Sequence, residues 1–179
     1  MEFMNATFPF ISLITGLPGS GKTTIANQFQ NKPLDGWQSF DFDKGKYKIP
    51  PTDNTEVQYK QLVWWLEKAA NLYRTDGTKS VIFGFWGFPE NLERAITEAG
   101  VEVEAVKIGY LYADIYALKS RKIVRGEKQL YDGELTGWKK AFIEALDEIG
   151  ARRFDTTNAT VEETYKEVKD WLRSSTELS

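Results

Sequence analysis

The sequence of 179 residues contains no cysteine and no histidine. The absence of cysteine excludes disulfides, a thiolate nucleophile and every cysteine–metal site. The absence of histidine removes the commonest general base, so any base catalysis has to come from a carboxylate. A bound metal would have to be one that prefers oxygen ligands, as Mg²⁺ does.

Long apolar runs are also absent, and no basic segment precedes an apolar one near residue 1. We therefore expect no membrane partner and a cytoplasmic location. The net charge is −3, so the chain has no global field that would attract nucleic acid. This balance argues against a nucleic-acid partner, although it leaves room for a local basic groove.

The composition is that of an ordinary globular domain, with 41% hydrophobic and 27% charged residues. A chain of this length suits one α/β domain with an ample core. We expect residues 1–179 to form that single domain, with a flexible N-terminus at residues 1–9. A monomer or a weak dimer is expected.

The most informative stretch is Gly-Leu-Pro-Gly-Ser-Gly-Lys-Thr at residues 16–23, which fits the phosphate-binding pattern G-x-x-x-x-G-K-[ST]. Its glycines let the backbone turn its N–H groups inward around a phosphate chain. Lys22 would place its charge against the β- and γ-phosphates, and the Thr23 hydroxyl could bind Mg²⁺. A strand-like run at 10–15 and a helix-like run at 24–29 flank the loop, as this motif requires. The alternative is a glycine-rich turn with a chance lysine.

A pair of carboxylates follows the next strand. Residues 37–43 alternate apolar and polar side chains, which predicts a strand ending near Asp41. In an extended segment Asp41 and Asp43 would point to the same side and could reach one ion or one substrate hydroxyl. The alternative is a solvated strand end with two surface acids. No acid directly follows the run at 80–87, which makes Asp41 more necessary as a metal-side carboxylate. Asp114 is either a helix cap or a second such acid.

The rest of the chain alternates between helical and strand patterns. Strands are expected at 80–87, at 105–112 and from residue 152, and helices at 55–74, 89–99, 114–125 and 132–149. A final helix should begin after Thr160, with Glu163 completing a capping box. This βαβαβαβαβα order predicts one doubly wound sheet.

Several features allow two interpretations. Residues 44–54 form either a solvated linker or part of the rim of an acceptor site. Trp64 and Trp65 cannot share one helix face, so one is core while the other either packs or lines a pocket. Gly84 and Gly87 allow either the close approach of a ligand or a simple bulge. The other aromatic side chains with this ambiguity are Phe42, Tyr47, Trp86, Tyr131 and Trp138.

Together these residues resemble the P-loop small-molecule and nucleotide kinases, the group that includes shikimate kinase, gluconate kinase and adenylate kinase. The resemblance implies a three-layer α/β fold with five parallel strands in the order 2-3-1-4-5. Residues 41–43 resemble the D-x-D of shikimate kinases. By that match Asp41 would support the Mg²⁺ shell, and Asp43 would be the acceptor-side carboxylate or base. No counterpart is found of the arginines that hold the carboxylate of shikimate.

Residues 121–125 are similar to the R-x-x-x-R at the start of the adenylate-kinase lid, with solvated basic residues as the alternative. The resemblance would place Arg121 against the adenine and Arg125 on the phosphates, in a short lid at about 121–131. Residues 155–158 resemble the loop that packs against the adenine, and about 44–75 would be the acceptor-side region. The nucleotide-binding residues expected by this resemblance are Gly16, Leu17, Pro18, Gly19, Ser20, Gly21, Lys22, Thr23, Thr24, Arg121, Asp155, Thr156 and Thr157.

The sequence thus predicts an ATP-dependent kinase that uses Mg²⁺ and transfers a phosphoryl group to a hydroxyl or phosphate of a small molecule or nucleotide. The expected catalytic residues are Lys22, Asp43 and Arg125, and the expected metal-side residues are Thr23 and Asp41. One alternative is a kinase of the 5′-hydroxyl end of polynucleotides. Another is a nucleotide-binding switch or degenerate kinase without transfer activity.

Overall fold

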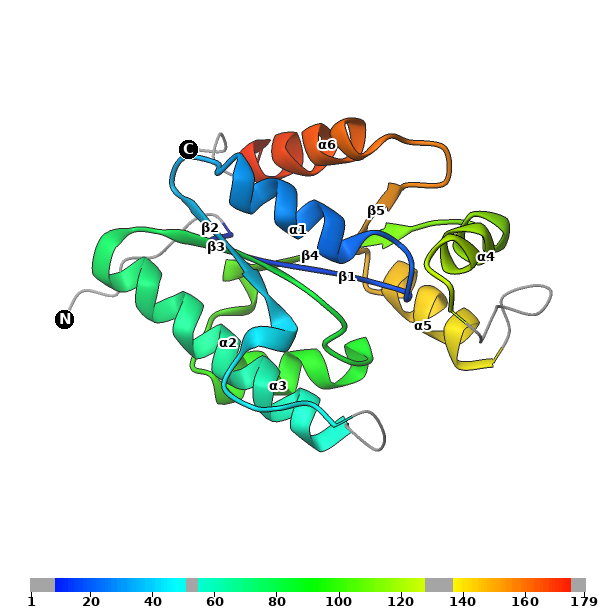
Figure 1. The fold of residues 1–179 in the computed structure, drawn as a ribbon. Coiled ribbons are helices and arrows are strands. Elements are labelled where there is room, and N and C mark those ends of the chain that lie inside the picture. The colour runs from blue at the N-terminus through cyan, green and yellow to red at the C-terminus, as the bar shows by residue number, and fades with distance from the viewer. Residues whose placement is uncertain (1–8, 51–54, 128–136, 175–179) are drawn as a thin grey trace.

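The fold is built on a parallel sheet whose strands come from the whole length of the chain (Figure 1). The computed structural model describes residues 9–50, 55–127 and 137–174. Within these residues the sheet has five strands in the order β2-β3-β1-β4-β5, as expected. The strands are β1 (Ile11–Gly16), β2 (Trp37–Asp41), β3 (Lys79–Phe83), β4 (Val106–Tyr112) and β5 (Arg152–Asp155).

Helices cover both faces of this sheet. On one face lie α1 (Lys22–Asn31) and α6 (Val161–Ser174), and on the other lie α2 (Thr55–Asp76), α3 (Leu92–Glu98) and α5 (Gly137–Glu148) (Figure 1). The helix α4 (Ile115–Val124) follows β4. Three short 3₁₀ turns complete the fold, namely η1 (Phe42–Lys44), η2 (Pro89–Asn91) and η3 (Val103–Ala105). Among the described helices none is long and apolar enough to span a membrane.

The helix positions follow from apolar spacing. In α2 the side chains of Leu62, Trp65 and Leu66 recur at helical intervals, and each is buried against the sheet. In α6 the corresponding buried side chains are Tyr165, Val168 and Leu172. These helices therefore bury their apolar stripes on opposite faces of one sheet, which gives the three-layer architecture.

Two helix starts are fixed by side chains that the sequence had marked. Thr160 and Glu163 form the expected capping box, because the Glu163 carboxylate accepts from the Thr160 N–H at 2.7 Å and the Glu163 N–H donates to the Thr160 hydroxyl at 3.2 Å. The Asp114 carboxylate accepts from the Ala117 N–H at 2.7 Å and caps α4. Its role is therefore that of the helix cap, one of the two alternatives that the sequence left open.

The strand that was expected at 80–87 ends at Phe83. The N–H of Gly84 still donates to the Ile14 carbonyl at 3.0 Å, but the chain then leaves the sheet. A Cβ on Gly84 would lie 2.3 Å from the Cβ of Phe42. Gly84 is therefore needed for close packing against a neighbouring side chain, a role that neither of the two interpretations of this glycine had considered.

We predict that Gly84→Ala lowers the free energy of unfolding by about 3 kcal/mol, because the added methyl group overpacks a site where Phe42 cannot retreat. Chemical denaturation followed by circular dichroism measures this change. The matched control is Gly77→Ala, where nothing lies within 4 Å of the added Cβ and the cost is only the left-handed backbone, about 1 kcal/mol. Equal costs for the two variants would show that contact with Phe42 is not the cause.

Candidate active site

The phosphate loop between β1 and α1 has the backbone that anion binding requires. Gly19 and Gly21 have φ angles of 91° and 105°, which side chains other than glycine rarely adopt. A Cβ on Gly16 would lie 2.5 Å from the carbonyl oxygen of Leu111. Gly21 is the N-cap of α1, and the first turn of this helix carries neither a side-chain cap nor an acidic residue. The N–H groups at the start of α1 are thus available to an anion.

Lys22 holds its own loop together. Its ammonium group donates to the carbonyl oxygens of Gly16 at 2.7 Å and Leu17 at 3.0 Å. The pKa of Lys22 is lowered to about 8, mainly by burial; the charge of Asp43 opposes this shift, and the charge of Arg125 adds to it. The side chain is therefore oriented before any ligand binds, and its charge is incompletely compensated by the protein.

The backbone of the carboxylate pair differs from the expected extended segment. β2 ends at Asp41, and η1 begins at the next residue. The Asp41 carboxylate accepts from the N–H of Asp43 at 3.1 Å and lies 3.7 Å from the ammonium group of Lys44. The reason for the difference is this local cap, which competes with an extended backbone.

Asp43 is nevertheless within electrostatic reach of the phosphate loop. Its pKa is raised by burial and by the neighbouring charge of Asp41, while Lys22 lowers it. Asp43 in turn raises the pKa of Lys22. That Asp43 sits opposite the lysine of the loop remains a prediction.

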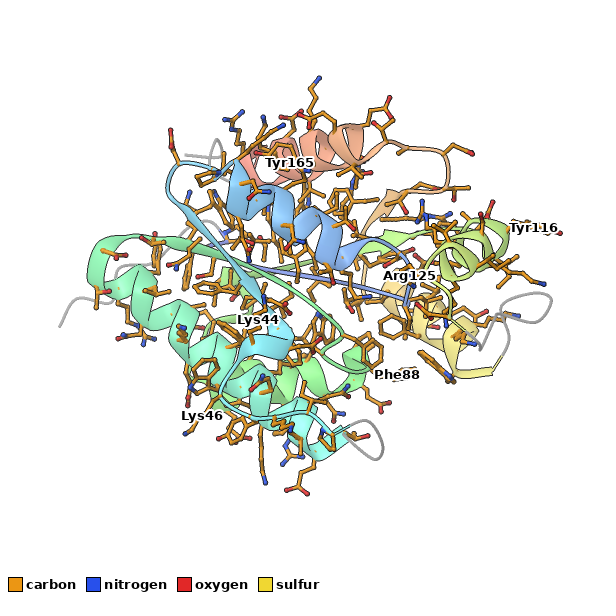
Figure 2. All side chains as sticks on the ribbon, viewed as in Figure 1. Lys44, Lys46, Phe88, Tyr116, Arg125 and Tyr165 are labelled. Atoms are coloured by element: carbon orange, nitrogen blue, oxygen red, sulfur yellow. The ribbon has the colours of Figure 1, made fainter. Side chains whose placement is uncertain are left out.

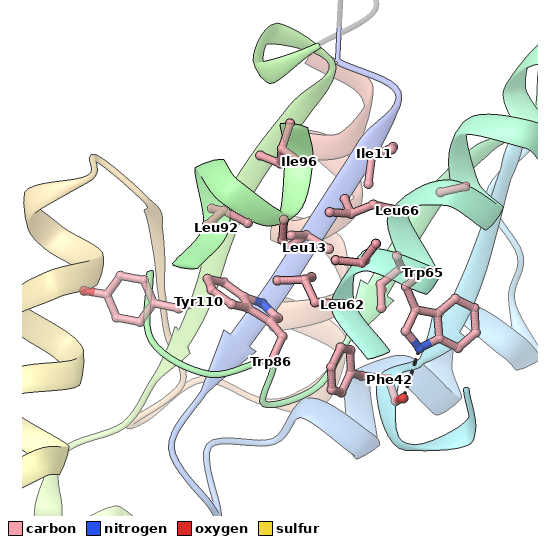
Figure 3. Close-up of a cluster of buried hydrophobic side chains, with 14 of the residues drawn as sticks. Ile11, Leu13, Phe42, Leu62, Trp65, Leu66, Trp86, Leu92, Ile96 and Tyr110 are labelled. Atoms are coloured by element: carbon pink, nitrogen blue, oxygen red, sulfur yellow. Dashed lines mark hydrogen bonds between the residues drawn. The ribbon is translucent and has the colours of Figure 1, made fainter. Parts of the chain in front are cut away.

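The segment that carries Asp43 is held by α2. The carbonyl oxygen of Phe42 accepts from the Gln61 amide at 2.8 Å and from the Trp65 indole at 3.0 Å (Figure 3). The other end of the Gln61 amide accepts from the N–H of Tyr47 at 2.8 Å. Phe42 itself is fully buried. Trp65 thus positions the carboxylate segment from the core, whereas the half-buried Trp64 packs edge-on against Trp65 with ring centroids 4.8 Å apart.

A second set of contacts joins the phosphate loop to α4 and to the segment after β5. The Arg121 guanidinium donates to the Gly19 carbonyl at 3.3 Å and to both oxygens of Thr156. The buried Thr156 hydroxyl in turn has the carbonyls of Ser20, at 3.2 Å, and Tyr112, at 2.9 Å, as acceptors for its single proton. Arg121 of α4 therefore bridges the phosphate loop and the segment after β5, and of its two interpretations the solvated one does not apply.

A cleft of about 350 Å³ lies beside this bridge, and we call it the donor cleft. It combines backbone of the phosphate loop with apolar side chains of α1, α4 and α6, which suits a flat base attached to a phosphate chain. Its lining residues are Gly19, Ser20, Gly21, Thr24, Ile25, Ser120, Arg121, Val124, Arg125, Thr156, Ala159, Val161 and Thr164.

The remaining expected nucleotide residues are distributed unevenly around the donor cleft. Thr156 lines it, whereas Asp155 and Thr157 line a neighbouring depression. There the Asp155 carboxylate accepts from the N–H of Thr157 at 2.9 Å, and the Thr157 hydroxyl accepts from the N–H of Asp114 at 3.0 Å. The structure thus places Thr156 with the phosphate loop, whereas its two neighbours bond to one another and to the start of α4.

Arg125 ends α4 close to the phosphate loop (Figure 2). A Cβ on Gly19 would lie 3.5 Å from its guanidinium group. The exposed Arg125 side chain pairs with Glu127 at 2.6 Å. Arg125 can therefore reach a phosphate only by exchanging this partner, and residues 128–131 of the expected lid lie outside the described residues.

A second cleft, of about 360 Å³, opens where β3 ends, and we call it the aromatic cleft. It lies between α2, the segment after β3 and α5, and its walls are mainly aromatic; Phe88, one of them, is labelled in Figure 2. Trp86 is buried and Trp138 is half-exposed, yet both line it. The lining residues are Thr55, Gln58, Tyr59, Leu62, Phe85, Trp86, Gly87, Phe88, Glu90, Asn91 and Trp138.

Much of both clefts was missed by sequence reasoning. Val124 and Val161 of the donor cleft and Gln58 and Phe85 of the aromatic cleft carry no motif. The signal that could have found the two valines is an apolar residue on the polar face of an amphipathic helix. Their exposed fractions, 84% for Val124 and 41% for Val161, are unusual for apolar side chains.

The two expected metal-side residues, Thr23 and Asp41, would need further ligands to hold a metal ion. Among the described residues no group of three or more acidic side chains is placed to hold a metal ion. Thr23 is exposed at the start of α1, and Asp41 is half-buried at the end of β2. An ion bound there would need oxygen ligands from phosphate and water, which is the usual coordination of Mg²⁺ on nucleotides.

Comparisons with known proteins agree with this geometry at the level of the fold. No protein-family model matches the chain, and no curated protein matches it by sequence. A sugar kinase from Janibacter sp. HTCC2649 superposes with a TM-score of 0.58 and 17% identity, covering 92% of this chain and 95% of that one. A gluconokinase from Sinorhizobium meliloti 1021 gives 0.53 and 16%, covering 96% of each chain.

A shikimate kinase from Acinetobacter baumannii, solved in complex with shikimate, gives a TM-score of 0.55 with 13% identity and covers 97% of each chain. These similarities extend over nearly the whole chain, although the identities are too low to carry over a substrate. The sheet order, the phosphate loop and the solved neighbours agree, and the chain has the fold of the P-loop small-molecule kinases.

Proposed function

We propose that this protein is an ATP-dependent phosphotransferase that moves the γ-phosphoryl group to a hydroxyl or phosphate of a small molecule. The observation that supports the proposal is the combination of a glycine-rich phosphate loop with the Asp43 carboxylate, which influences the Lys22 ammonium group of that loop electrostatically. A nucleotide-binding switch would need the loop and the donor cleft but no carboxylate at that point. A transferase needs one to orient the acceptor hydroxyl.

The residues present fit a nucleoside triphosphate. The positive-φ glycines and the uncapped start of α1 suit the phosphates, and Ile25, Val124 and Val161 offer apolar surface to the base. When bound, ATP with Mg²⁺ supplies the transferable phosphoryl group and neutralises part of its charge. Thr23 and, through water, Asp41 would hold the metal side.

Each catalytic residue has a separate task. Lys22 would stabilise negative charge on the transferred group, and Arg125 would add to this after leaving Glu127. Asp43 would accept a hydrogen bond from the acceptor hydroxyl and take its proton as the new oxygen–phosphorus bond forms. Burial and the charge of Asp41 raise the pKa of Asp43, which makes this carboxylate a better proton acceptor than a free one.

We predict that nucleotide binding takes up a proton at alkaline pH. In the free protein Lys22 has a pKa of about 8, so at about pH 9 most of its amine is neutral. Phosphate charge placed beside the amine raises that pKa, and the protein must then gain a proton. Calorimetric titration of a non-hydrolysable ATP analogue in buffers of different ionisation enthalpy measures the uptake.

The uptake should disappear in Lys22→Met and at about pH 6, where the amine is already charged. An undiminished uptake in Lys22→Met would assign the proton to another group.

A screen of ATP consumption over nucleosides, nucleotides, sugars and amino alcohols tests the proposed function. We expect at least one small acceptor to accelerate ATP consumption and to become phosphorylated. Phosphorylation of 5′-hydroxyl oligonucleotides alone would instead identify a polynucleotide kinase. Nucleotide binding without transfer to any acceptor would indicate a switch or a degenerate kinase.

A further inference from the structure

The aromatic cleft contains a buried polar atom for which the described residues provide no partner. Trp86 is 2% exposed, and its indole N–H has no acceptor there. Buried polar groups are nearly always hydrogen-bonded, because leaving one unpaired costs about 1–3 kcal/mol. The carboxamide residue Gln58 lines the same cleft. An unpaired indole N–H in the lining of a cleft indicates a place where a ligand supplies the partner.

Gln58 contrasts with the next glutamine on the same face of α2. The Gln61 amide uses both of its ends, toward Phe42 and Tyr47, and thereby holds the segment of Asp43. Gln58 lies one turn away, toward the aromatic cleft. Its carboxamide oxygen is 3.8 Å from the place of a Cβ on Gly87. One glutamine therefore supports the carboxylate segment while its neighbour lines the aromatic cleft.

The cleft is also adjacent to the carboxylate that would receive the acceptor. β2 and β3 pair in register so that Asp41 lies opposite Phe83, and Phe42 packs against Gly84. The lining segment that contains Phe85 and Trp86 starts immediately after this point. In the close-up Trp86, Leu62 and Phe42 lie in one cluster (Figure 3). A molecule bound between Gln58 and Trp86 would therefore sit beside Asp43.

The charge of the lining disfavours one kind of acceptor. Among the described lining residues none is lysine or arginine, and Glu90 is the charged one. Two cations stack on lining rings: Arg94 lies 4.9 Å from the ring centroid of Tyr59, and Lys139 lies 5.9 Å from that of the half-exposed Trp138. An acceptor with a carboxylate would meet a like charge and no cation in the lining itself, so its binding would be penalised.

We propose that the acceptor is an uncharged hydroxyl compound with a flat apolar face, held in the aromatic cleft by the Gln58 carboxamide and the Trp86 indole N–H. The aromatic walls, Phe85 and Trp138 among them, bind the apolar face of a sugar ring or an aromatic ring. The amide and the indole N–H bind hydroxyl groups, and one further hydroxyl reaches Asp43. This inference rests on the proposed function and extends it to the class of substrate.

The proposed class of acceptor is tested by measuring, without ATP, the binding of compounds in pairs that consist of a neutral member and its carboxylate. The pairs are phenyl β-D-glucoside with phenyl β-D-glucuronide, adenosine with adenosine-5′-carboxylate, and methyl β-D-glucoside with its glucuronide. Saturation-transfer NMR should detect the neutral member of at least one pair and show it binding at least tenfold more tightly than its carboxylate. The methyl glucosides distinguish a sugar-ring site from an aromatic-ring site.

Gln58→Leu separates a ligand role from a structural one. It replaces a cleft-lining amide that makes no hydrogen bond holding another described segment by an apolar group of similar size, so stability should change little. Binding of the preferred neutral compound should weaken about tenfold or more. Trp138→Ala should weaken it as well, whereas Tyr116→Ala, an equally large change at an 80% exposed position outside the cleft, should not.

Three outcomes would overturn the proposal: tighter binding of the carboxylated members, no binding by any pair, or unchanged affinity together with loss of stability in Gln58→Leu. Each is distinguishable from failure of the proposed function, which is tested by nucleotide binding and transfer in the same wild-type preparation.

Discussion

Asp43→Asn should reduce the rate of phosphoryl transfer by about 10²- to 10⁴-fold, the usual contribution of a positioned general base. Asparagine keeps the size of the side chain but can neither take the proton nor carry the charge. The backbone conformation should be retained, because none of the hydrogen bonds that hold η1 uses the side chain of residue 43. The N–H of residue 43 donates to the Asp41 carboxylate, and the side chains of Gln61 and Trp65 donate to the Phe42 carbonyl. The effect should therefore fall on kcat, with the affinity for a non-hydrolysable ATP analogue changed less than threefold.

Asp35→Asn is the matched control for this variant. Asp35 is an exposed acid in the turn before β2, at the opposite end of the strand, so its replacement removes the same charge far from the loop. Its kinetics should equal those of the wild type. Wild-type turnover in Asp43→Asn would remove this residue from the mechanism.

Lys22→Ala should lower nucleotide affinity or turnover by a factor of about 10² or more, equivalent to about 3 kcal/mol. The Lys22 amine is the positive group of the loop. Burial lowers its pKa in the absence of ligand, because the protein compensates its charge poorly. A bound phosphate would supply the missing negative partner. Steady-state kinetics and calorimetric titration of the ATP analogue measure the two effects separately.

Lys32→Ala provides the comparison at the other end of the same helix. Lys32 pairs with Glu162 at 3.0 Å in an exposed position, which contributes little to stability. The Lys32→Ala variant should bind nucleotide and turn over substrate like the wild type. Circular dichroism should show that both variants are folded. Normal nucleotide binding by a folded Lys22→Ala would contradict the assignment of the donor site.

The phosphate loop and the sheet could be predicted from the sequence because their determinants are local. The glycines at 16, 19 and 21 and the flanking apolar runs specify strand, turn and helix within twenty residues. The capping residues Asp114 and Thr160 act on neighbours three positions away, and both were identified. The strand order followed from the resemblance, and the structure confirms it.

The environment of Asp43 could not be predicted in the same way. Its backbone is determined by a capping bond from Asp41 and by bonds from Gln61 and Trp65, which lie 19 and 23 residues from Phe42 in the chain. Nothing in the local pattern distinguishes a 3₁₀ turn from a continued strand there. That Asp43 is an acid facing the loop stays a prediction, although its carboxylate and Lys22 influence each other's pKa.

The aromatic cleft depends still more on tertiary structure. Gln58, Phe85 and Trp138 come from α2, from the segment after β3 and from α5, and each looks like an ordinary core or surface residue in its own element. For Trp86 the two interpretations, core or pocket, turn out not to exclude one another, since this buried indole also lines the cleft, whereas the half-exposed Trp138 lines the cleft without being core.

The most direct test of the central claim is a ¹⁵N NMR titration with Mg²⁺ and a non-hydrolysable ATP analogue. The account requires the backbone amides of the loop between β1 and α1 to receive the phosphates. The largest chemical-shift changes should therefore fall on the amides of residues 16–23, Gly19 and Gly21 among them, with saturation at one nucleotide per chain. Changes concentrated at the aromatic cleft, or loop amides that do not respond at saturating nucleotide, would contradict it.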